Sequence, residues 1–292
     1  MALPASGPLT LAQIQTEFGG TNPIDLSEYY RGGAYVTANN TGVPTSGTIS
    51  IGNFYGAVKQ FAFTISSNLA TAQNLRTLAL AAGWNAADPV LATIATGVVI
   101  SPTNTGQAAL TISGSFPAGV ILVNNGYIVG QGGSGGNGNA FNGFAGGPAL
   151  SVSTSVSINN TSGVIAGGGG GGGGGAAGGT GGRLGGGGGG GGGQTGLTAS
   201  AAGPGGPAPW YPGFDGTTGS FSAAGTGGAA GYVPWGGGGG AGGAWGTAGS
   251  AGIVGIDASY PTSGAGGAAG NAVTGNSNIT WLATGTRYGP IT

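Results

Sequence analysis

The sequence predicts a mainly β and irregular protein with a short helical module, a solenoid-like β-rich middle and a polyglycine-II helix bundle that carries loops at its ends. Three observations predict this fold class. Residues 1–56 contain helix-capping signals, residues 57–165 contain alternating apolar residues, and 53 of the 76 glycines lie in residues 126–249. We expect the bundle over residues 166–270 and a C-terminal strand within 271–292 that returns to the β-rich part.

Residues 1–56 contain three short helical signals, each preceded by a capping residue. Thr10, Asp25 and Ser50 are the expected caps, and glycine follows the first two helical stretches as a stop signal. The apolar and aromatic residues that follow these caps are Leu11, Ile14, Phe18, Tyr29, Tyr30, Phe54 and Tyr55. The module is interpreted either as a cap on the main domain or as a docking segment for another protein or for a second copy.

Residues 57–165 carry strand patterns and one helix. "QFAFTIS" alternates Phe61, Phe63 and Ile65, as expected for a half-buried strand. "TAQNLRTLALAAGW" places apolar residues on one helical face and ends with a glycine stop. Further strands are expected in "VLATIATGVVI", "AALTIS", "VILVNNGYIVG" and "LSVSTSVSINN", with a tight turn at Asn125-Gly126.

A weak internal repeat connects the β-rich part to the glycine block. "LVNNGYIVGQGGSGG" at 122–136 resembles "SINNTSGVIAGGGGG" at 157–171, and "ITWLATGTRYGPI" at 279–291 resembles a degenerate third copy. Each copy has a strand, a turn and a second short apolar strand. Repeated units of this kind predict stacked β coils from which glycine-rich excursions emerge.

Two runs of nine glycines, 167–175 and 185–193, raise the question of what can order them. Ordering each backbone residue costs about 1–2 kcal/mol, and glycine has no side chain whose burial offsets that cost. The backbone amides and carbonyls remain as the source of stability. Extended helices with three residues per turn make no internal hydrogen bonds, so they satisfy these groups laterally. The runs therefore predict a bundle of such helices, with alanine on outer faces.

Composition excludes several classes of function. The chain has no cysteine and no histidine, five basic residues and six acidic residues. No thiolate or imidazole metal site, no Cys nucleophile and no Ser-His-Asp arrangement can form. Asp215 and Asp257 offer a carboxylate pair, but their spacing does not support a glycosidase. We expect no enzyme activity, catalytic residue, cofactor, metal, nucleic-acid partner or membrane insertion.

The loops between the glycine runs are rich in aromatic residues and proline. Proline reduces the entropy lost on binding, and large rings provide contact area at low entropic cost. These loops are interpreted as a binding surface or, alternatively, as a cover over the glycine layers. Arg183, between the two long runs, is expected in an exposed turn or, alternatively, in contact with an acidic group of the receptor or a lipopolysaccharide phosphate. The candidate binding residues are Trp210, Tyr211, Phe214, Asp215, Tyr232, Trp235, Trp245, Asp257 and Tyr260.

The motif "INNTSGVIAGGGGGGGGG" and the tail "ITWLATGTRYGPI" carry a resemblance to the distal tail-fibre adhesins of T-even-like phages, over roughly residues 120–292. The resemblance implies a virion protein at a tail-fibre tip whose variable loops bind a host outer-membrane protein or a surface glycan. Residues 1–56 resemble N-terminal segments of other phage virion proteins, which implies attachment to another tail or fibre protein and leaves a homo-oligomer open. The alternative is a structural virion component without a receptor.

Overall fold

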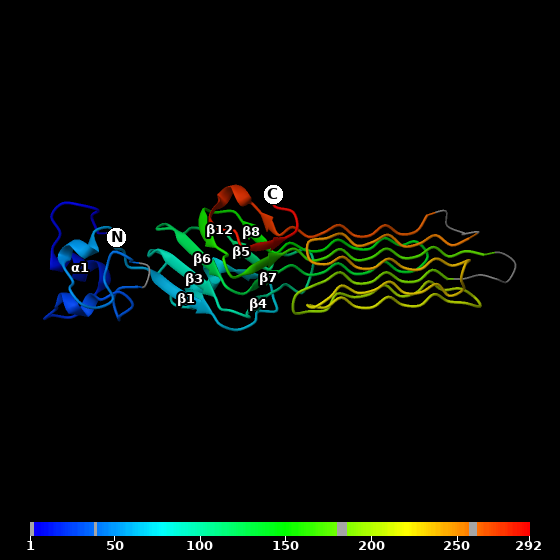
Figure 1. Cartoon of the computed structure of the whole chain (residues 1–292), viewed down its shortest axis with the longest axis horizontal. Coiled ribbons are helices and arrows are strands. Elements are labelled where there is room, and N and C mark those ends of the chain that lie inside the picture. The colour runs from blue at the N-terminus through cyan, green and yellow to red at the C-terminus, as the bar shows by residue number, and fades with distance from the viewer. Residues whose placement is uncertain (1–2, 38–39, 180–185, 257–261) are drawn as a thin grey trace.

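The computed structural model describes residues 3–37, 40–179, 186–256 and 262–292. The two α-helices are α1 (Leu11–Phe18) and α2 (Leu75–Ala81), and the 3₁₀ helices are η1 (Leu26–Tyr29), η2 (Ile51–Phe54) and η3 (Asn276–Asn278). The strands are β1 (Phe61–Ile65), β2 (Gln73–Asn74), β3 (Val90–Ile94), β4 (Val99–Ile100), β5 (Leu110–Ile112), β6 (Val120–Asn124), β7 (Tyr127–Val129), β8 (Leu150–Val152), β9 (Val156–Asn159), β10 (Val164–Ala166), β11 (Val273–Thr274), β12 (Ile279–Ala283) and β13 (Thr286–Tyr288). Figure 1 shows a helical module at one end, the strands in the middle and long extended segments at the other end.

The predicted capping residues begin the helices of the N-terminal module. The Thr10 side chain accepts a hydrogen bond from the Gln13 amide, and the Gln13 side chain accepts one from the Thr10 amide, which forms a capping box at α1. The Asp25 carboxylate accepts a 2.7 Å hydrogen bond from the Ser27 amide at the start of η1. Ser50 precedes η2 and forms a capping box with Asn53, so all three predicted caps are confirmed.

The module has a hydrophobic core of its own, separate from that of the strands. Ile14, Phe18, Tyr29 and Phe54 are buried together with five smaller or aliphatic residues of the module. Asn40 ties the module to the connector before β1, because its side chain donates to the Val58 carbonyl and accepts from the Val58 amide. The connector therefore leaves the module in a fixed direction.

The strands form three parallel sheets, in the orders β1-β3-β6-β9-β12, β13-β10-β7-β4 and β11-β8-β5-β2. The chain visits each sheet in turn, so each new circuit adds one strand to each sheet. Register is kept between circuits: Leu122 of β6 lies between Ala92 of β3 and Ile158 of β9. The three stacked parallel sheets, formed by β1 to β13, are named here the β coil.

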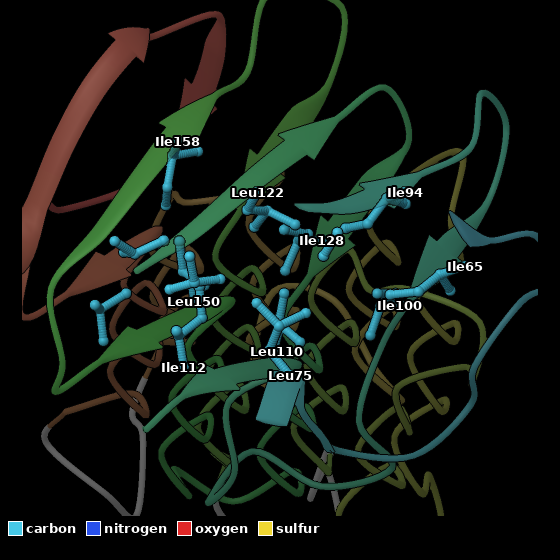
Figure 2. Packing of buried hydrophobic residues seen from close by; sticks show 14 of the residues in the cluster. Ile65, Leu75, Ile94, Ile100, Leu110, Ile112, Leu122, Ile128, Leu150 and Ile158 are labelled. Atoms are coloured by element: carbon cyan, nitrogen blue, oxygen red, sulfur yellow. The ribbon is translucent and has the colours of Figure 1, made fainter. Parts of the chain in front are cut away.

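Aliphatic side chains from all three sheets fill the centre of this β coil. Ile94, Leu122 and Ile158 point inward from the first sheet toward Leu110 and Leu150 of the third (Figure 2). Helix α2 covers the start of the coil and buries Leu75 and Ala79 in the same cluster. The β coil therefore has one continuous hydrophobic core, from which the glycine-rich segments extend.

The Asn125-Gly126 turn is a corner between two sheets rather than a hairpin, because β6 and β7 belong to different sheets. A ladder of buried asparagine side chains supports this corner in successive coils. The side-chain amide of Asn124 donates a 2.7 Å hydrogen bond to the side-chain oxygen of Asn160, and the side-chain amide of Asn160 donates to the Thr284 carbonyl. One asparagine of each Asn-Asn pair, Asn124 and Asn160, thus links neighbouring coils.

The chain leaves and rejoins the β coil in two excursions. Among the described residues, these excursions contain ten extended glycine-rich segments. Chain excursions start after β7 and β10 and end before β8 and β11, and the segments run side by side away from the strands (Figure 1). In chain order they are 130–138, 141–147, 167–176, 186–194, 200–206, 211–220, 225–231, 236–243, 247–253 and 264–270.

Segment 167–176 is surrounded by six others and shows a strict three-residue repeat in its hydrogen bonds. Every third amide donates to the same neighbour, and the three neighbours that accept are 141–147, 186–194 and 247–253. The carbonyls of 167–176 accept from three further segments, 130–138, 236–243 and 264–270. All ten residues of the segment are buried.

Segment 186–194 is the second interior segment and also has six neighbours. It donates to 130–138, 211–220 and 236–243, and it accepts from 167–176, 200–206 and 225–231. Together the contacts define three layers. One outer layer consists of segments 141–147, 130–138 and 200–206. The middle layer consists of 264–270, 167–176, 186–194 and 211–220. The other outer layer consists of 247–253, 236–243 and 225–231.

Close packing explains why the two interior segments are glycine. A Cβ atom on Gly170 or Gly172 would lie closer than 3.0 Å to the backbone of a neighbouring segment. Outer segments meet neighbours on fewer sides, and their glycines recur every third residue, as at Gly225, Gly228 and Gly231. Some of the positions between these glycines hold exposed side chains, such as Thr226 and Ala229.

Candidate functional site

The end of the glycine bundle that is distant from the β coil is formed by loops and turns, and it is named here the distal tip. Its described loops are 139–140, 207–212, 232–235 and 254–256 with 262–263. The turns at 195–199, 220–224 and 244–246 lie at the opposite end, next to the β coil. Alternate loops therefore lie at opposite ends, because each segment crosses the whole bundle (Figure 1).

Three aromatic rings stack at the distal tip and join two of its loops. The Tyr211 and Tyr232 rings lie 4.6 Å apart between centroids with an interplanar angle of 19°, and the Tyr232 and Trp235 rings lie 4.9 Å apart at 11°. Tyr211 comes from loop 207–212, and the other two come from loop 232–235. The three residues are named here the aromatic stack, and they hold the two loops in one arrangement.

Two further predicted residues lie beside the stack in the sequence and are exposed. Trp210 is 71% exposed and Phe214 is 62% exposed. Asp215 has a structural contact, since its carboxylate accepts a 2.8 Å hydrogen bond from the Gly205 amide. That bond joins segments 200–206 and 211–220, so Asp215 helps to set the position of the loop between them.

Trp245 is one of the predicted binding residues, and the structure places it at the other end of the bundle. Its indole N–H donates a 3.0 Å hydrogen bond to the Thr195 carbonyl. Its ring packs against Phe221 at 5.0 Å and against Tyr127 and Tyr288 of the β coil at 6.4 and 6.3 Å. Trp245 therefore fastens the bundle to the β coil and is not part of the distal tip.

Two predicted binding residues, Asp257 and Tyr260, lie outside the described residues, and so does Arg183. The sequence interpretation also missed a group of aliphatic residues at the distal tip. Val233, Ile253, Val254 and Ile256 are 72%, 62%, 44% and 56% exposed. The stretch "AGIVGI" at 251–256 is the signal that could have identified three of them, since it is unusually apolar for an exposed loop.

These aliphatic residues line a groove of about 450 Å³ beside the aromatic stack, named here the distal groove. Val233, Pro234, Ile253, Val254 and Ile256 are its larger lining residues. Gly236, Gly237 and Gly238, with Ala229 and Ala230, complete the lining. No charged or hydrogen-bonding side chain is among the described lining residues.

The predicted attachment residues of the N-terminal module divide into two groups. Ile14, Phe18, Tyr29 and Phe54 are at most 3% exposed, so they form the core of the module and cannot contact a partner directly. This corrects the expectation for those four residues. Leu11, Tyr30 and Tyr55 remain accessible, and Tyr55 is 42% exposed while its hydroxyl donates to the Gly7 carbonyl.

A second hollow lies where the module meets the β coil. It measures about 560 Å³ and is lined by the connector residues Val58 and Gln60 and by the starts of β3, β6 and β9. Val90, Val120 and Val156 contribute to a mainly apolar lining.

Within the described part of the chain, no group of three or more histidine, cysteine or acidic side chains is placed to hold a metal ion. No helix among the described residues is both long and apolar enough to cross a bilayer.

Comparison with known proteins identifies relatives for most of the chain. Residues 60–292 match the family model of the phage tail fibre adhesin Gp38. The structure is similar to the gp37-gp38 adhesin tip complex of the bacteriophage S16 long tail fibre, with a TM-score of 0.56 and 25% sequence identity over 85% of this chain and 88% of that chain. Comparison with curated proteins gives no significant match. The chain therefore belongs to the phage tail fibre adhesin Gp38 family, and its place is in the tail fibre of the virion.

Proposed function

We propose that this chain binds a receptor on the host cell surface through the distal tip. The observation that carries the proposal is the aromatic stack of Tyr211, Tyr232 and Trp235, together with the exposed side chain of Trp210, which directly precedes Tyr211 in the sequence. Rings held in a fixed arrangement provide contact area without losing much entropy on binding. Membership of an adhesin family supports a binding role rather than catalysis.

We further propose that the extended segments are polyglycine-II helices and that the β coil is a short solenoid. The three-residue repeat of lateral hydrogen bonds supports the first assignment, because such a helix has three residues per turn. The repeated visits to three parallel sheets support the second. In this proposal the close-packed bundle is a rigid arm, and the distal loops can vary in sequence without disturbing it.

We propose that residues 1–56 attach the adhesin to another tail-fibre protein. The similar S16 structure is a complex of gp38 with gp37, which supports a protein partner of this kind. The accessible side chains Leu11, Tyr30 and Tyr55 and the apolar hollow next to Val58 are the surfaces that such a partner would contact. The buried core of the module would hold these surfaces in place.

Adsorption of the purified protein to host cells tests the proposed function. Trp210→Ala and Trp235→Ala should each lower the affinity by roughly 30-fold or more, the usual size of a hot-spot loss. Phe144→Ala is a matched control, because Phe144 is 65% exposed but lies halfway along the bundle. Equal adsorption by wild type and both tryptophan variants, with unchanged thermal transitions, would contradict the proposal and favour a structural role in the fibre.

A further inference from the structure

We infer that four residues at the base of the glycine bundle, Gln131, Gln194, Thr195 and Trp245, hold the distal tip in a fixed direction relative to the β coil. They are named here the base lock. The inference rests on the proposed function, because it assigns positioning residues to the receptor-binding tip. The base lock lies at the opposite end of the bundle from that tip, so it acts on binding without touching the receptor.

The segments of the bundle are joined to the β coil in two different ways. Four of them continue into strands: 130–138 follows β7, 141–147 precedes β8, 167–176 follows β10 and 264–270 precedes β11. Hydrogen bonds connect these four segments to one another, so they lie together on one side of the bundle. The other six described segments reach the β coil at turns rather than at strands. These turns are 195–199, 220–224 and 244–246.

The aromatic stack is carried by segments of the second kind. Tyr211 begins segment 211–220, and Tyr232 and Trp235 lie between segments 225–231 and 236–243. A bundle that was joined to the β coil along one side only would be free to tilt about that side. Contacts at the three turns are therefore needed to fix the direction of the tip.

The polar half of the base lock joins turn 195–199 to the chain that leaves β7. The Thr195 side chain is fully buried, and its hydroxyl lies 3.0 Å from Oε1 of Gln131 and accepts a 3.1 Å hydrogen bond from the Gly132 amide. Nε2 of Gln131 donates a 3.3 Å hydrogen bond to the Thr198 carbonyl. Because Gln131 follows β7 by two positions, these bonds tie the turn to the β coil.

Gln194 joins the other two turns to each other. Its Oε1 accepts a 3.1 Å hydrogen bond from the Trp245 amide, and its Nε2 donates a 2.8 Å hydrogen bond to the Phe221 carbonyl. The Trp245 ring in turn packs against Tyr127 of β7 and Tyr288 of β13. One connected set of side chains therefore links the turns to the sheet that contains β7 and β13.

The base lock depends on its polar groups being paired. Within the described part of the chain, no buried side-chain nitrogen or oxygen lacks a hydrogen-bond partner. Removal of the Thr195 hydroxyl would leave Oε1 of Gln131 and the Gly132 amide unpaired in the interior, which is unfavourable. Once the other end of the protein is held by a virion, a stiff base limits the orientations that the tip must search before it meets a receptor. The base lock should thus affect adsorption of virions and not that of the freely tumbling purified protein.

The direction of the tip can be measured with spin labels, because the chain has no cysteine of its own. Thr64 of β1 and Ala145 and Ala229 of the bundle are exposed, so Cys substitutions there accept labels. Pulsed electron paramagnetic resonance should show that Thr195→Val broadens the distance distribution between positions 64 and 229 and leaves that between 145 and 229 unchanged. Unchanged distributions for both pairs would overturn the inference. So would broadening of both pairs, because the bundle itself would then be loosened.

Adsorption to host cells tests the consequence for binding, with thermal unfolding and abundance in virions as checks on each variant. We expect virions that carry Thr195→Val or Gln194→Leu to adsorb roughly fivefold or more slowly than wild type, while the purified variants adsorb as wild type does. Thr195→Ser keeps the hydroxyl and should restore virion adsorption.

The outcomes separate this inference from the proposed function. Wild-type adsorption rates for virions with folded Thr195→Val and Gln194→Leu would overturn the base lock alone. Weaker adsorption of the purified variants would also overturn it, because the substitutions would then act on the tip itself. If purified wild-type protein does not adsorb to host cells, the proposed function fails, whatever the spin labels show about the base.

Discussion

The amide of Gly172 donates a 2.8 Å hydrogen bond to the carbonyl of Gly191, and this bond joins the two long glycine runs in the middle of the bundle. Both residues are buried, and neither has room for a Cβ atom. The runs are therefore uninterrupted because they are the two interior segments. Outer segments tolerate side chains on the faces that lack a neighbour.

Substitution of an interior glycine should disrupt the bundle. We expect Gly172→Ala to lower the free energy of unfolding by about 2 kcal/mol or more, because the new methyl group overlaps the backbone near Gly240. Gly238→Ala should change it by less than about 0.5 kcal/mol, since that position has room. Chemical denaturation of both variants tests the expectation, and equal stability of the two would show that the layers are loosely packed.

The sequence predicted the bundle over residues 166–270, and this bound was wrong, because segments 130–138 and 141–147 also run in the bundle and bond to its interior segments. It did not show which loops share an end of the bundle. That depends on how many times the chain has crossed the bundle, and each crossing is marked only by glycines at every third position, such as Gly225, Gly228 and Gly231. Trp245 follows the eighth segment, so it lies next to the β coil and not at the distal tip.

It was also difficult to predict which apolar residues are buried, because aromatic and aliphatic side chains occur both in hydrophobic cores and on binding surfaces. Aromatic residues in the N-terminal module suggested contacts with a partner, but Phe18, Tyr29 and Phe54 pack against one another at 6.3–6.5 Å between centroids. A module of this size needs its largest side chains for its own core. The exposed aliphatic residues of the distal groove were missed for the converse reason, because apolar residues are normally assigned to the interior.

The asparagine ladder should be a strong determinant of β-coil stability. Asn160 is fully buried, accepts from Asn124 and donates to the carbonyls of Thr284 and Thr286. Asn160→Ala leaves these groups unpaired, and we expect a loss of about 2–4 kcal/mol in thermal or chemical unfolding. Asn159→Ala is the control, since its half-buried side chain serves only the turn at Thr161. A smaller effect at Asn160 than at Asn159 would contradict the assignment.

Stability should be almost independent of pH between about pH 5 and pH 9, because the chain has no histidine or cysteine to titrate in that range. The Ser27 amide lowers the pKa of Asp25 below 3.8, so its contribution is present above that value and is lost as the pH falls further. Burial raises the pKa of Tyr29 above 10.0, so folding opposes its ionisation only at high pH. Thermal transitions measured across the range test this, and a midpoint shift of more than about 5 °C would contradict it.

Removal of residues 1–56 should separate attachment from adsorption. The module has its own core, so its loss leaves the core of the β coil intact. We expect the truncated protein to adsorb to host cells as wild type does but to be absent from purified virions. Detection of the truncated protein in virions at wild-type abundance would show that the attachment surface lies elsewhere, for example on the starts of β3, β6 and β9.

Tyr232 should act as a positioning residue in receptor binding, because its ring is the middle one of the aromatic stack and is less exposed than that of Tyr211. Tyr232→Ala removes both ring contacts, which frees loops 207–212 and 232–235 from each other. We expect roughly tenfold weaker adsorption with a nearly unchanged thermal transition, since the lateral backbone hydrogen bonds of the segments do not involve the Tyr232 side chain. Tyr232→Phe keeps the ring and should restore adsorption. A positioning role also predicts a slower association rate for Tyr232→Ala, because the loops must be ordered during binding. Equal losses in Tyr232→Ala and Tyr232→Phe would show that the hydroxyl contacts the receptor directly.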